Sequence, residues 1–426
     1  MKRIILLLMI SSSVWAQQPK KNKYSINEFM LIEKVEDQEK KYNEVLKEPA
    51  QNLAPTALND FRAELTLAWL SKGNVERYQY YKSTSPKFSY RQGLYLGYAV
   101  EKLLDEKKDY INAEKISKAL LDDLTKGKMD GDAVRPSVLY EVNAAANAKL
   151  GNVDMAKKMI AKSSEDKSSE SRLIKYFKDM QANYLNRHAM VMLAAGEHQK
   201  AFDTLNKAFK DAESNSYMVE TFKEAFKKVK GTDQGFDDYL KSLKAEAYQK
   251  YYKEVETHYV SAPSKTITGT FPDPSGGAKM LTSFEAKTPV EAVAMKSLDG
   301  KTVNLGDYKG KILVLDFWTT LCTPCVAAFA GFEKVVSDYK KDDLQLFVVN
   351  IFEERAAVKA FAAQKPVTLN VLQDQENTAY SVAATPTKIV FDSIGNIRFF
   401  SSGYAGSTDR EYYKLKAMVE ITKARS

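Results

Sequence analysis

Two cysteines three positions apart, Cys322 and Cys325, are the only thiols of this 426-residue chain. They stand between the apolar runs KILVLDFW and VAAFA, where a buried strand is expected to end and a helix to begin. At a helix N-terminus the unpaired N–H groups and the macrodipole favour an anion, so a thiol there has a lowered pKa. We therefore expect Cys322 to be an exposed attacking sulfur and Cys325, one turn later, a shielded resolving sulfur.

The residues between and around the cysteines leave other uses of the pair to consider. Thr323 and Pro324 separate the two thiols, and Pro324 suits a helix start because it has no N–H to leave unpaired. A structural zinc site needs four ligands, and no histidine follows His258, so neither a metal nor a cofactor is expected. A structural disulfide that never reacts remains an alternative.

The N-terminal stretch MKRIILLLMISSSVWAQQ predicts a secretory signal peptide. Lys2 and Arg3 precede the apolar run from Ile4 to Ile10, which is too short to span a membrane. The sequence Val14-Trp15-Ala16 places small residues at the expected cleavage offsets, so cleavage is expected after Ala16. The mature chain is then expected in the periplasm, without a transmembrane anchor after cleavage.

Composition limits the class of partner. The formal net charge is +8, and the basic residues are spread along the chain instead of forming blocks. Nucleic-acid binding requires a clustered basic surface, so no nucleic-acid partner is expected. Two cysteines cannot form a disulfide framework in a chain this long, which must be held together by two or three ordinary cores.

Residues 17–257 are expected to form a helical domain, because the chain from residue 24 to about 255 reads as one helix after another. Two segments, AAANAKLGNVDMAKKMI and AMVMLAAGEHQKAFDTLNKAF, share a glycine five residues before an alanine, at Gly151 and Gly196. This pattern resembles degenerate tetratricopeptide (TPR-like) hairpins, in which the glycine lies in the turn between two helices. The glycines are 45 residues apart, against about 34 in a regular repeat, so plain helical packing remains an alternative.

The texture changes after His258. The stretch SAPSKTITGTFPDPSGG predicts a linker or small β element over 258–280. Residues 281–426 then predict an α/β domain, in which EAVAMKSL and KTVNL form a hairpin and KILVLDFW, LQLFVVNIF, TLNVLQD, TKIVFDS and IGNIRFF form further strands. Helices are expected near 326–340, 355–364, 375–384 and 407–424.

At these residues the chain resembles the thioredoxin fold, and in particular the TlpA/ResA-like periplasmic thiol–disulfide oxidoreductases. The buried strand ending in Asp316-Phe317-Trp318, the Cys322–Cys325 pair and the later Thr385-Pro386-Thr387 occur in the expected order. The lead-in LDGKTVNLGDYKGKILVLDFW is also characteristic of that family and its peroxiredoxin relatives. The resemblance covers about residues 280 to 426 and implies a thioredoxin-like domain after the helical one.

The resemblance implies roles for three further residues. Asp316 matches the buried acid that exchanges a proton with the resolving thiol, a role that a raised pKa would permit. Pro386, after Thr385, matches the cis-proline loop that packs beside the dithiol and pairs with extended substrate backbone. Glu353 matches an acidic residue beside the active site in the ResA branch, although a solvated carboxylate after a strand would look the same.

The expected function is that of an exported oxidoreductase whose redox-active Cys322–Cys325 disulfide exchanges with protein disulfides. The expected partners are exported proteins that contain disulfides and a membrane or periplasmic electron donor. Leu321 stands where family members often have Trp before the first cysteine, a departure that bears on the redox potential and on partner recognition. The dipeptide Thr323-Pro324 contains no histidine, so a reductase or isomerase is favoured over a strong oxidase. The alternatives are a helical interaction protein with a minor redox domain, and peroxiredoxin-like activity, against which Leu315 stands in place of a required proline.

Overall fold

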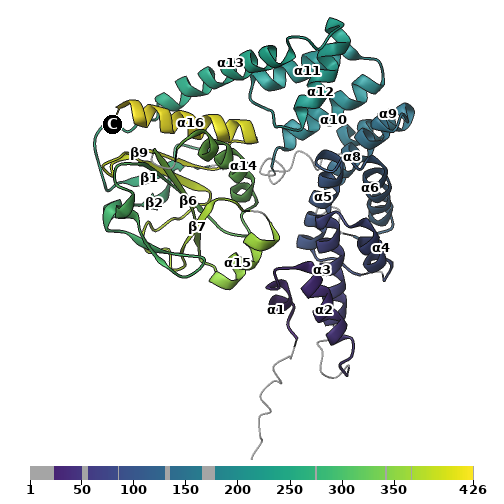
Figure 1. Cartoon of the computed structure of the whole chain (residues 1–426), viewed down its shortest axis with the longest axis horizontal. Coiled ribbons are helices and arrows are strands. Elements are labelled where there is room, and N and C mark those ends of the chain that lie inside the picture. Colours follow the sequence, from purple (N-terminus) through teal and green to yellow (C-terminus); the bar gives the residue numbers. More distant parts are fainter. Residues whose placement is uncertain are drawn as a thin grey trace, which may run out of the picture.

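The computed structural model describes residues 24–49, 56–84, 86–129, 135–165, 178–273, 276–340, 343–365 and 367–425. The expected signal peptide lies outside these residues. A column of helices comes first in the chain and stands beside a domain built on a β-sheet (Figure 1). The expected fold class, a helical domain followed by a thioredoxin-like α/β domain, is confirmed.

The helical domain consists of paired helices with short turns. Gly73, Gly151 and Gly196 lie in the turns between α3 and α4, α8 and α9, and α10 and α11, with φ of 85°, 82° and 80°. These left-handed angles suit glycine, which has no Cβ to clash with the preceding turn. Descent from a repeat remains a prediction. The helices are α1 (Ile26–Met30), α2 (Val35–Val45), α3 (Ala57–Lys72), α4 (Val75–Ser83), α5 (Tyr90–Asp105), α6 (Tyr110–Thr125), α8 (Pro136–Lys149), α9 (Val153–Glu165), α10 (Met180–Ala194), α11 (His198–Lys210), α12 (Met218–Lys230) and α13 (Phe236–Glu256).

Two sheets follow. A small antiparallel pair, β1 (Thr268–Pro272) and β2 (Met280–Glu285), precedes a seven-stranded sheet of order β4-β3-β7-β6-β5-β8-β9. The centre of this sheet, β5–β6–β7, is parallel. Strand β8 runs antiparallel to β5, and β9 runs antiparallel to β8. The elements are β3 (Ala294–Ser297), β4 (Thr302–Asn304), β5 (Ile312–Trp318), α14 (Thr323–Asp338), β6 (Leu344–Ile351), α15 (Arg355–Gln364), β7 (Asn370–Asp374), β8 (Thr387–Phe391), β9 (Ile397–Ser402) and α16 (Thr408–Arg425).

Strand β5 is buried on both faces, which explains its unbroken apolar sequence. Val314 and Trp318 pack in one core with α14, α15 and α16, and Leu315 and Phe317 pack in the core on the opposite face. Alternation along the strand therefore directs the residue between Val314 and Trp318, Asp316, toward the helices.

The helix expected over 375–384 is wrong, because this segment is a series of turns. Asp374 accepts hydrogen bonds from the backbone N–H of Thr378 and Ala379, and Asn377 exchanges two hydrogen bonds with the backbone of Val382. Such side chain to backbone bonds offer the chain an alternative to the helical ladder. The turns bury the side chain of Tyr380 in the core beneath β5.

The last helix of the helical domain continues into the sheet domain. Helix α13 runs alongside α16 (Figure 1), and Tyr251 packs on Tyr413 with ring centroids 6.3 Å apart. Val255 of α13 is part of the core formed by α14 and α16. The segment after α13 follows strand β9, where Val260 N–H donates to the carbonyl of Arg398 at 2.8 Å. The two domains are thus joined by side-chain packing along α13 and by a backbone hydrogen bond of the segment that follows α13.

Candidate functional site

The two cysteines lie at the start of α14 in unequal surroundings. Helix α14 begins at Thr323, three residues earlier than expected, which makes Cys322 its N-cap residue. Cys322 is half-buried, whereas Cys325 is 0% exposed and packs in the core with Trp318. The two sulfurs are joined in a disulfide with the Cα atoms 5.3 Å apart. Pro324 lies in the first turn of the helix, where its missing N–H costs nothing.

Asp316 lies on the same face of β5 as the core that contains Cys325. It is 1% exposed, and neither of its carboxylate oxygens has a hydrogen-bond partner among the described residues. The pKa of this carboxyl is raised from 3.8 to about 8, chiefly by burial; the nearby Lys388 opposes the shift and Glu411 contributes to it. A carboxyl with this pKa can take up or release a proton near neutral pH.

A buried ion pair, which the sequence analysis did not identify, lies next to Asp316. Lys388 on β8 is the strand-register partner of Asp316, and its Nζ lies 3.2 Å from Oε2 of Glu411 on α16. The same Nζ lies 4.4 Å from the ring centroid of Phe332 on α14. A lysine followed by the apolar residues Ile389 to Phe391 in a buried strand was a signal of a buried partner, because lysine is rarely buried unpaired.

Glu353 anchors the segment between β5 and the dithiol helix. Its Oε2 accepts hydrogen bonds from the N–H of Thr320 and from Nδ2 of Asn350, both at 2.7 Å, and its Oε1 accepts from the Thr320 hydroxyl at 2.5 Å. Glu353 is therefore a bonded carboxylate beside the site and not a fully solvated one. Its bonds hold the backbone two residues before Cys322.

The Thr385–Pro386 peptide bond is cis, and the chain on either side of it is held by hydrogen bonds. The carbonyl of Pro386 accepts from the N–H of Gly403 at 2.9 Å, which ties the cis-proline segment to the loop after β9. Ser283 of β2 hydrogen-bonds to the hydroxyl of Thr387 at 2.6 Å. Part of the support for this segment therefore comes from the small β pair before the main sheet.

Two large apolar side chains project into solvent beside these residues. Leu321 is 71% exposed and Phe352 is 63% exposed, and each immediately adjoins a residue bonded in the Glu353 cluster. Phe352 has φ of 66°, which is unfavourable for a residue with a bulky side chain. Such strain persists only where neighbouring bonds enforce it, and here it places an aromatic ring at the surface near the dithiol.

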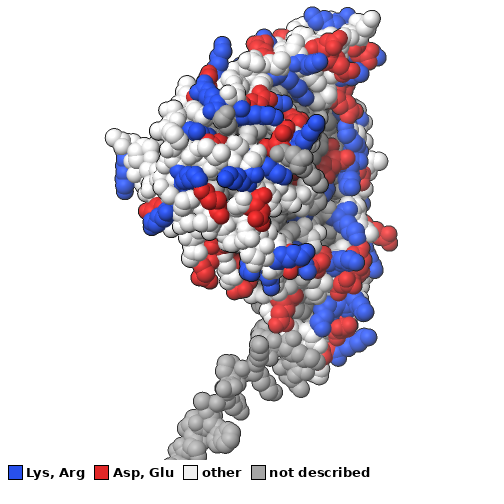
Figure 2. Space-filling view, turned by 60° about the vertical axis from the view of Figure 1, so that its left-hand side comes forward, with Lys and Arg blue, Asp and Glu red and all other residues white. Residues whose placement is uncertain are grey.

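The structure thus gathers Asp316, Cys322, Cys325 and Glu353 around the end of β5 and the start of α14. It places Pro386 at the start of β8, the strand that pairs with β5. On the face drawn in Figure 2, Lys and Arg side chains lie among Asp and Glu side chains. Within the described part of the chain, no helix is both long and apolar enough to cross a membrane.

Comparisons with known proteins concern the sheet domain. The model of the AhpC/TSA family matches residues 282–400. The thioredoxin-like protein YneN of Bacillus subtilis is 34% identical over 110 residues, which are 25% of this chain and 64% of YneN. The solved structure of StoA from Bacillus subtilis is 22% identical and covers 30% of this chain and 98% of that one, with a TM-score of 0.26.

One relative is similar enough, over enough of its own length, to assign this chain to a family. The thiol-disulfide oxidoreductase ResA of Geobacillus kaustophilus is 31% identical over 120 residues, which are 28% of this chain and 69% of that ResA. The helical domain lies outside the residues that the family model matches. Through its C-terminal domain, the chain belongs to the ResA-type thiol-disulfide oxidoreductases.

Proposed function

We propose that this chain is exported and reduces or isomerises disulfide bonds of other exported proteins through Cys322 and Cys325. The observation that carries the proposal is the inequality of the two sulfurs. Cys322 is half-buried at a helix N-terminus, and Cys325 is fully buried on the same side of the sheet as Asp316. This arrangement supports one sulfur that meets the substrate and one that releases it.

In the first step, the Cys322 thiolate attacks one sulfur of the substrate disulfide. The Cys322–substrate bond forms, the substrate S–S bond breaks, and the departing sulfur takes up a proton from solvent. The N-terminus of α14 favours the anionic sulfur before the attack.

In the second step, the Cys325 thiol passes its proton to the ionised form of Asp316 and attacks the sulfur of Cys322. The Cys322–Cys325 disulfide forms and the second substrate sulfur leaves as a thiol after protonation. Two electrons have then passed from the dithiol to the substrate, and a membrane or periplasmic thiol donor must return them. If a substrate thiol attacks the mixed disulfide first, the result is isomerisation.

The reducing direction is favoured by the dipeptide Thr323-Pro324, which places no imidazolium beside Cys322. A strongly oxidising protein needs such stabilisation of the reduced thiolate. The reduction potential of the Cys322–Cys325 couple, measured against glutathione, tests this part of the proposal. A potential near that of glutathione or lower supports a reductase, and one far above it supports an oxidase.

Trapping of mixed disulfides tests the order of the two sulfurs. Cys325→Ser is expected to accumulate mixed disulfides through Cys322 with periplasmic proteins, and Cys322→Ser is expected to abolish insulin reduction and to trap nothing. Mass spectrometry of the trapped species identifies the sulfur that carries the substrate. Traps formed only through Cys325 would reverse the assignment, and no reduction by the wild-type chain would reduce the pair to a structural disulfide.

Two other functions have support of their own. The match to the AhpC/TSA family model supports peroxide reduction, which is tested by hydrogen peroxide consumption with dithiothreitol as the reductant. The helical domain supports a scaffold role, as a platform that brings a partner to the dithiol or as a spacer. Wild-type rates with insulin well above those with peroxide favour disulfide exchange as the main activity.

A further inference from the structure

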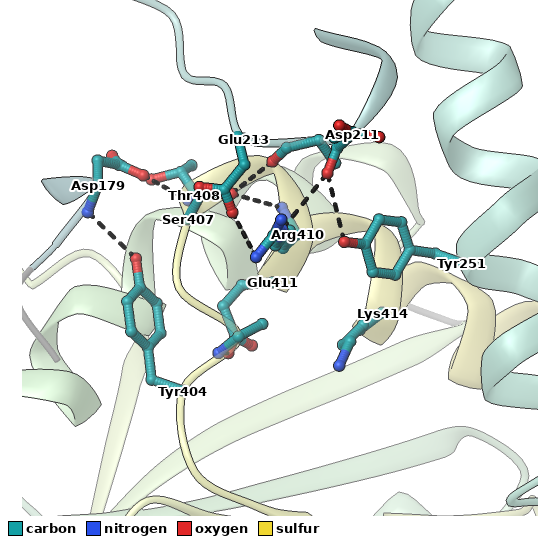
Figure 3. A network of polar contacts seen from close by, with 12 residues as sticks. Asp179, Asp211, Glu213, Tyr251, Tyr404, Ser407, Thr408, Arg410, Glu411 and Lys414 are labelled. Atoms are coloured by element: carbon teal, nitrogen blue, oxygen red, sulfur yellow. Dashed lines mark hydrogen bonds and ion pairs between the residues drawn. The ribbon is translucent and has the colours of Figure 1, made fainter. Parts of the chain in front are cut away.

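The first turn of α16 is capped by a residue of the helical domain. Asp179 accepts hydrogen bonds from the backbone N–H of Thr408 at 2.5 Å and from its hydroxyl at 2.7 Å (Figure 3). Asp179 precedes α10, but its carboxylate makes no capping bond to that helix. The carboxylate is buried and serves the other domain, 229 residues along the chain.

Neighbouring residues strengthen the same contact. The Ser407 hydroxyl donates to the carbonyl of Ala212 at 2.6 Å, and the Ser214 hydroxyl donates to Asp409 at 2.6 Å. Arg410 forms an ion pair with Glu213 of the connection between α11 and α12 (Figure 3). These groups are largely buried, so loss of one partner would leave an unsatisfied polar group.

The capped turn is continuous with the cis-proline segment. Thr408 ends the loop that begins at Gly403, whose N–H donates to the carbonyl of Pro386 at 2.9 Å. Tyr404 of this loop accepts a hydrogen bond from the N–H of Asp179 at 3.4 Å. Asp179 therefore holds both ends of the loop that supports the cis-proline segment.

The same turn also contacts the dithiol helix and the ion pair beside Asp316. A Cβ added at Gly331 of α14 would lie 2.6 Å from the Cβ of Glu411, so the two helices touch at a glycine. Lys334 of α14 forms an ion pair with Asp409. Glu411 accepts from the N–H of Ala405 at 2.6 Å while it pairs with the lysine of β8.

We propose that Asp179 is a positioning residue of the redox site, by which the helical domain holds the loop 403–408 and through it the cis-proline segment. The proposal rests on the proposed function, because it requires that the backbone of a protein substrate lies along the cis-proline segment. The helical domain is then a structural part of the site as well as a neighbour of it. Loss of the Asp179 side chain is expected to slow the reduction of extended polypeptide substrates more than that of small disulfides, which have no polypeptide backbone to align.

Substitution by glycine isolates this role. Asp179 has φ of 54°, an angle that glycine adopts freely and that asparagine tolerates, so neither Asp179→Gly nor Asp179→Asn strains the backbone. Glycine is also accepted at the start of a helix. The matched control is Asp109→Gly, since Asp109 also precedes a helix of this domain but accepts from its own helix, at the N–H of Asn112.

Hydrogen exchange followed by mass spectrometry on the full-length variants measures directly how firmly Asp179 holds the loop 403–408. In Asp179→Gly, we expect exchange of the amides of 403–411 to accelerate by roughly 3- to 30-fold, the effect of losing one capping side chain. In Asp109→Gly, faster exchange is expected at the start of α6 and not in this loop. Unchanged exchange of 403–411 in Asp179→Gly overturns the proposal.

Kinetics then separate positioning from general stability. For Asp179→Gly, kcat/KM for insulin is expected to fall at least about threefold further than kcat/KM for a small aromatic disulfide, while Asp179→Asn, which keeps one acceptor, recovers most of the loss. Equal losses with both substrates, or the same loss in Asp109→Gly, refute a positioning role. A wild-type chain that reduces neither disulfide refutes the proposed function instead. The exchange measurement still reports whether Asp179 holds the loop 403–408.

Discussion

The substitution Asp316→Asn gives a quantitative test of the raised pKa of the buried Asp316 carboxyl. Because burial raises the pKa of Asp316 from 3.8 to about 8, the folded chain keeps a proton that the unfolded chain releases between these values. Proton release favours the unfolded state over this interval, so the contribution of Asp316 to stability is greatest below pH 3.8. It declines as the pH rises and levels off above about pH 8.

The size of the effect follows from the interval between the two pKa values. Each pKa unit corresponds to about 1.4 kcal/mol, so the difference between 3.8 and about 8 sets an upper bound of about 6 kcal/mol. Asp316→Asn keeps the size and polarity of the protonated acid but cannot ionise. The variant is therefore expected to match the wild type near pH 4 and to exceed its free energy of unfolding by roughly 3 to 5 kcal/mol at pH 8.

Denaturant unfolding of the oxidised proteins from pH 4 to pH 9 measures this difference without interference from free thiols. The control variant is Asp203→Asn, which removes the carboxylate of an exposed residue by the same chemical change. A difference that stays flat with pH, or a variant less stable than wild type at pH 8, refutes a raised pKa at Asp316. In turnover assays the variant is expected to be slower, most clearly above neutral pH, because the proton acceptor for the resolving thiol is gone.

Three further changes test the surroundings of the dithiol. Gly331→Ala inserts a Cβ against the first turn of α16 and is expected to cost about 1–3 kcal/mol in denaturant unfolding and to slow insulin reduction; full stability would show that the helices can separate freely. Glu353→Gln removes the anionic acceptor for Thr320 and is expected to cost about 1–3 kcal/mol, whereas a neutral change would make those hydrogen bonds unimportant. Lys388→Met leaves Glu411 buried without its cation and is expected to cost about 3–5 kcal/mol; the simultaneous change Glu411→Leu should restore much of this, and failure to do so would indicate damage other than a broken pair.

Local pattern was sufficient to predict the centre of the redox domain. Strand β5 and helix α15 were expected where the structure has them, because a continuous apolar run and a periodic apolar face each specify one element without outside help. The placement of Cys322 at a helix start followed from the same pattern. The segment 375–384 failed because Asp374 and Asn377 bond to the nearby backbone, and this competition outweighed a composition that suits a helix.

The contacts that hold the site in place could not be predicted, because they join residues that are distant in the sequence. Asp179 and Thr408 are 229 positions apart, and nothing near either one in the chain indicates the other. Lys388 was visible as a charge in a buried strand, but its partner Glu411 becomes a neighbour only when α16 packs across the sheet. Tertiary contacts of this kind depend on how two finished domains meet, and no periodicity along one segment encodes them.

The position of α16 after the helical domain in the sequence has a consequence for assembly. Because a polypeptide is synthesised from its N-terminus, the helical domain can fold first, with Asp179, Ser214 and the carbonyl of Ala212 still bonded to water. Their partners on Ser407 to Asp409 arrive only with the last helix, which also completes the packing of α14. The order of synthesis therefore places docking of the two domains after folding of the helical domain, and the dithiol acquires its finished surroundings only once α16 has been made.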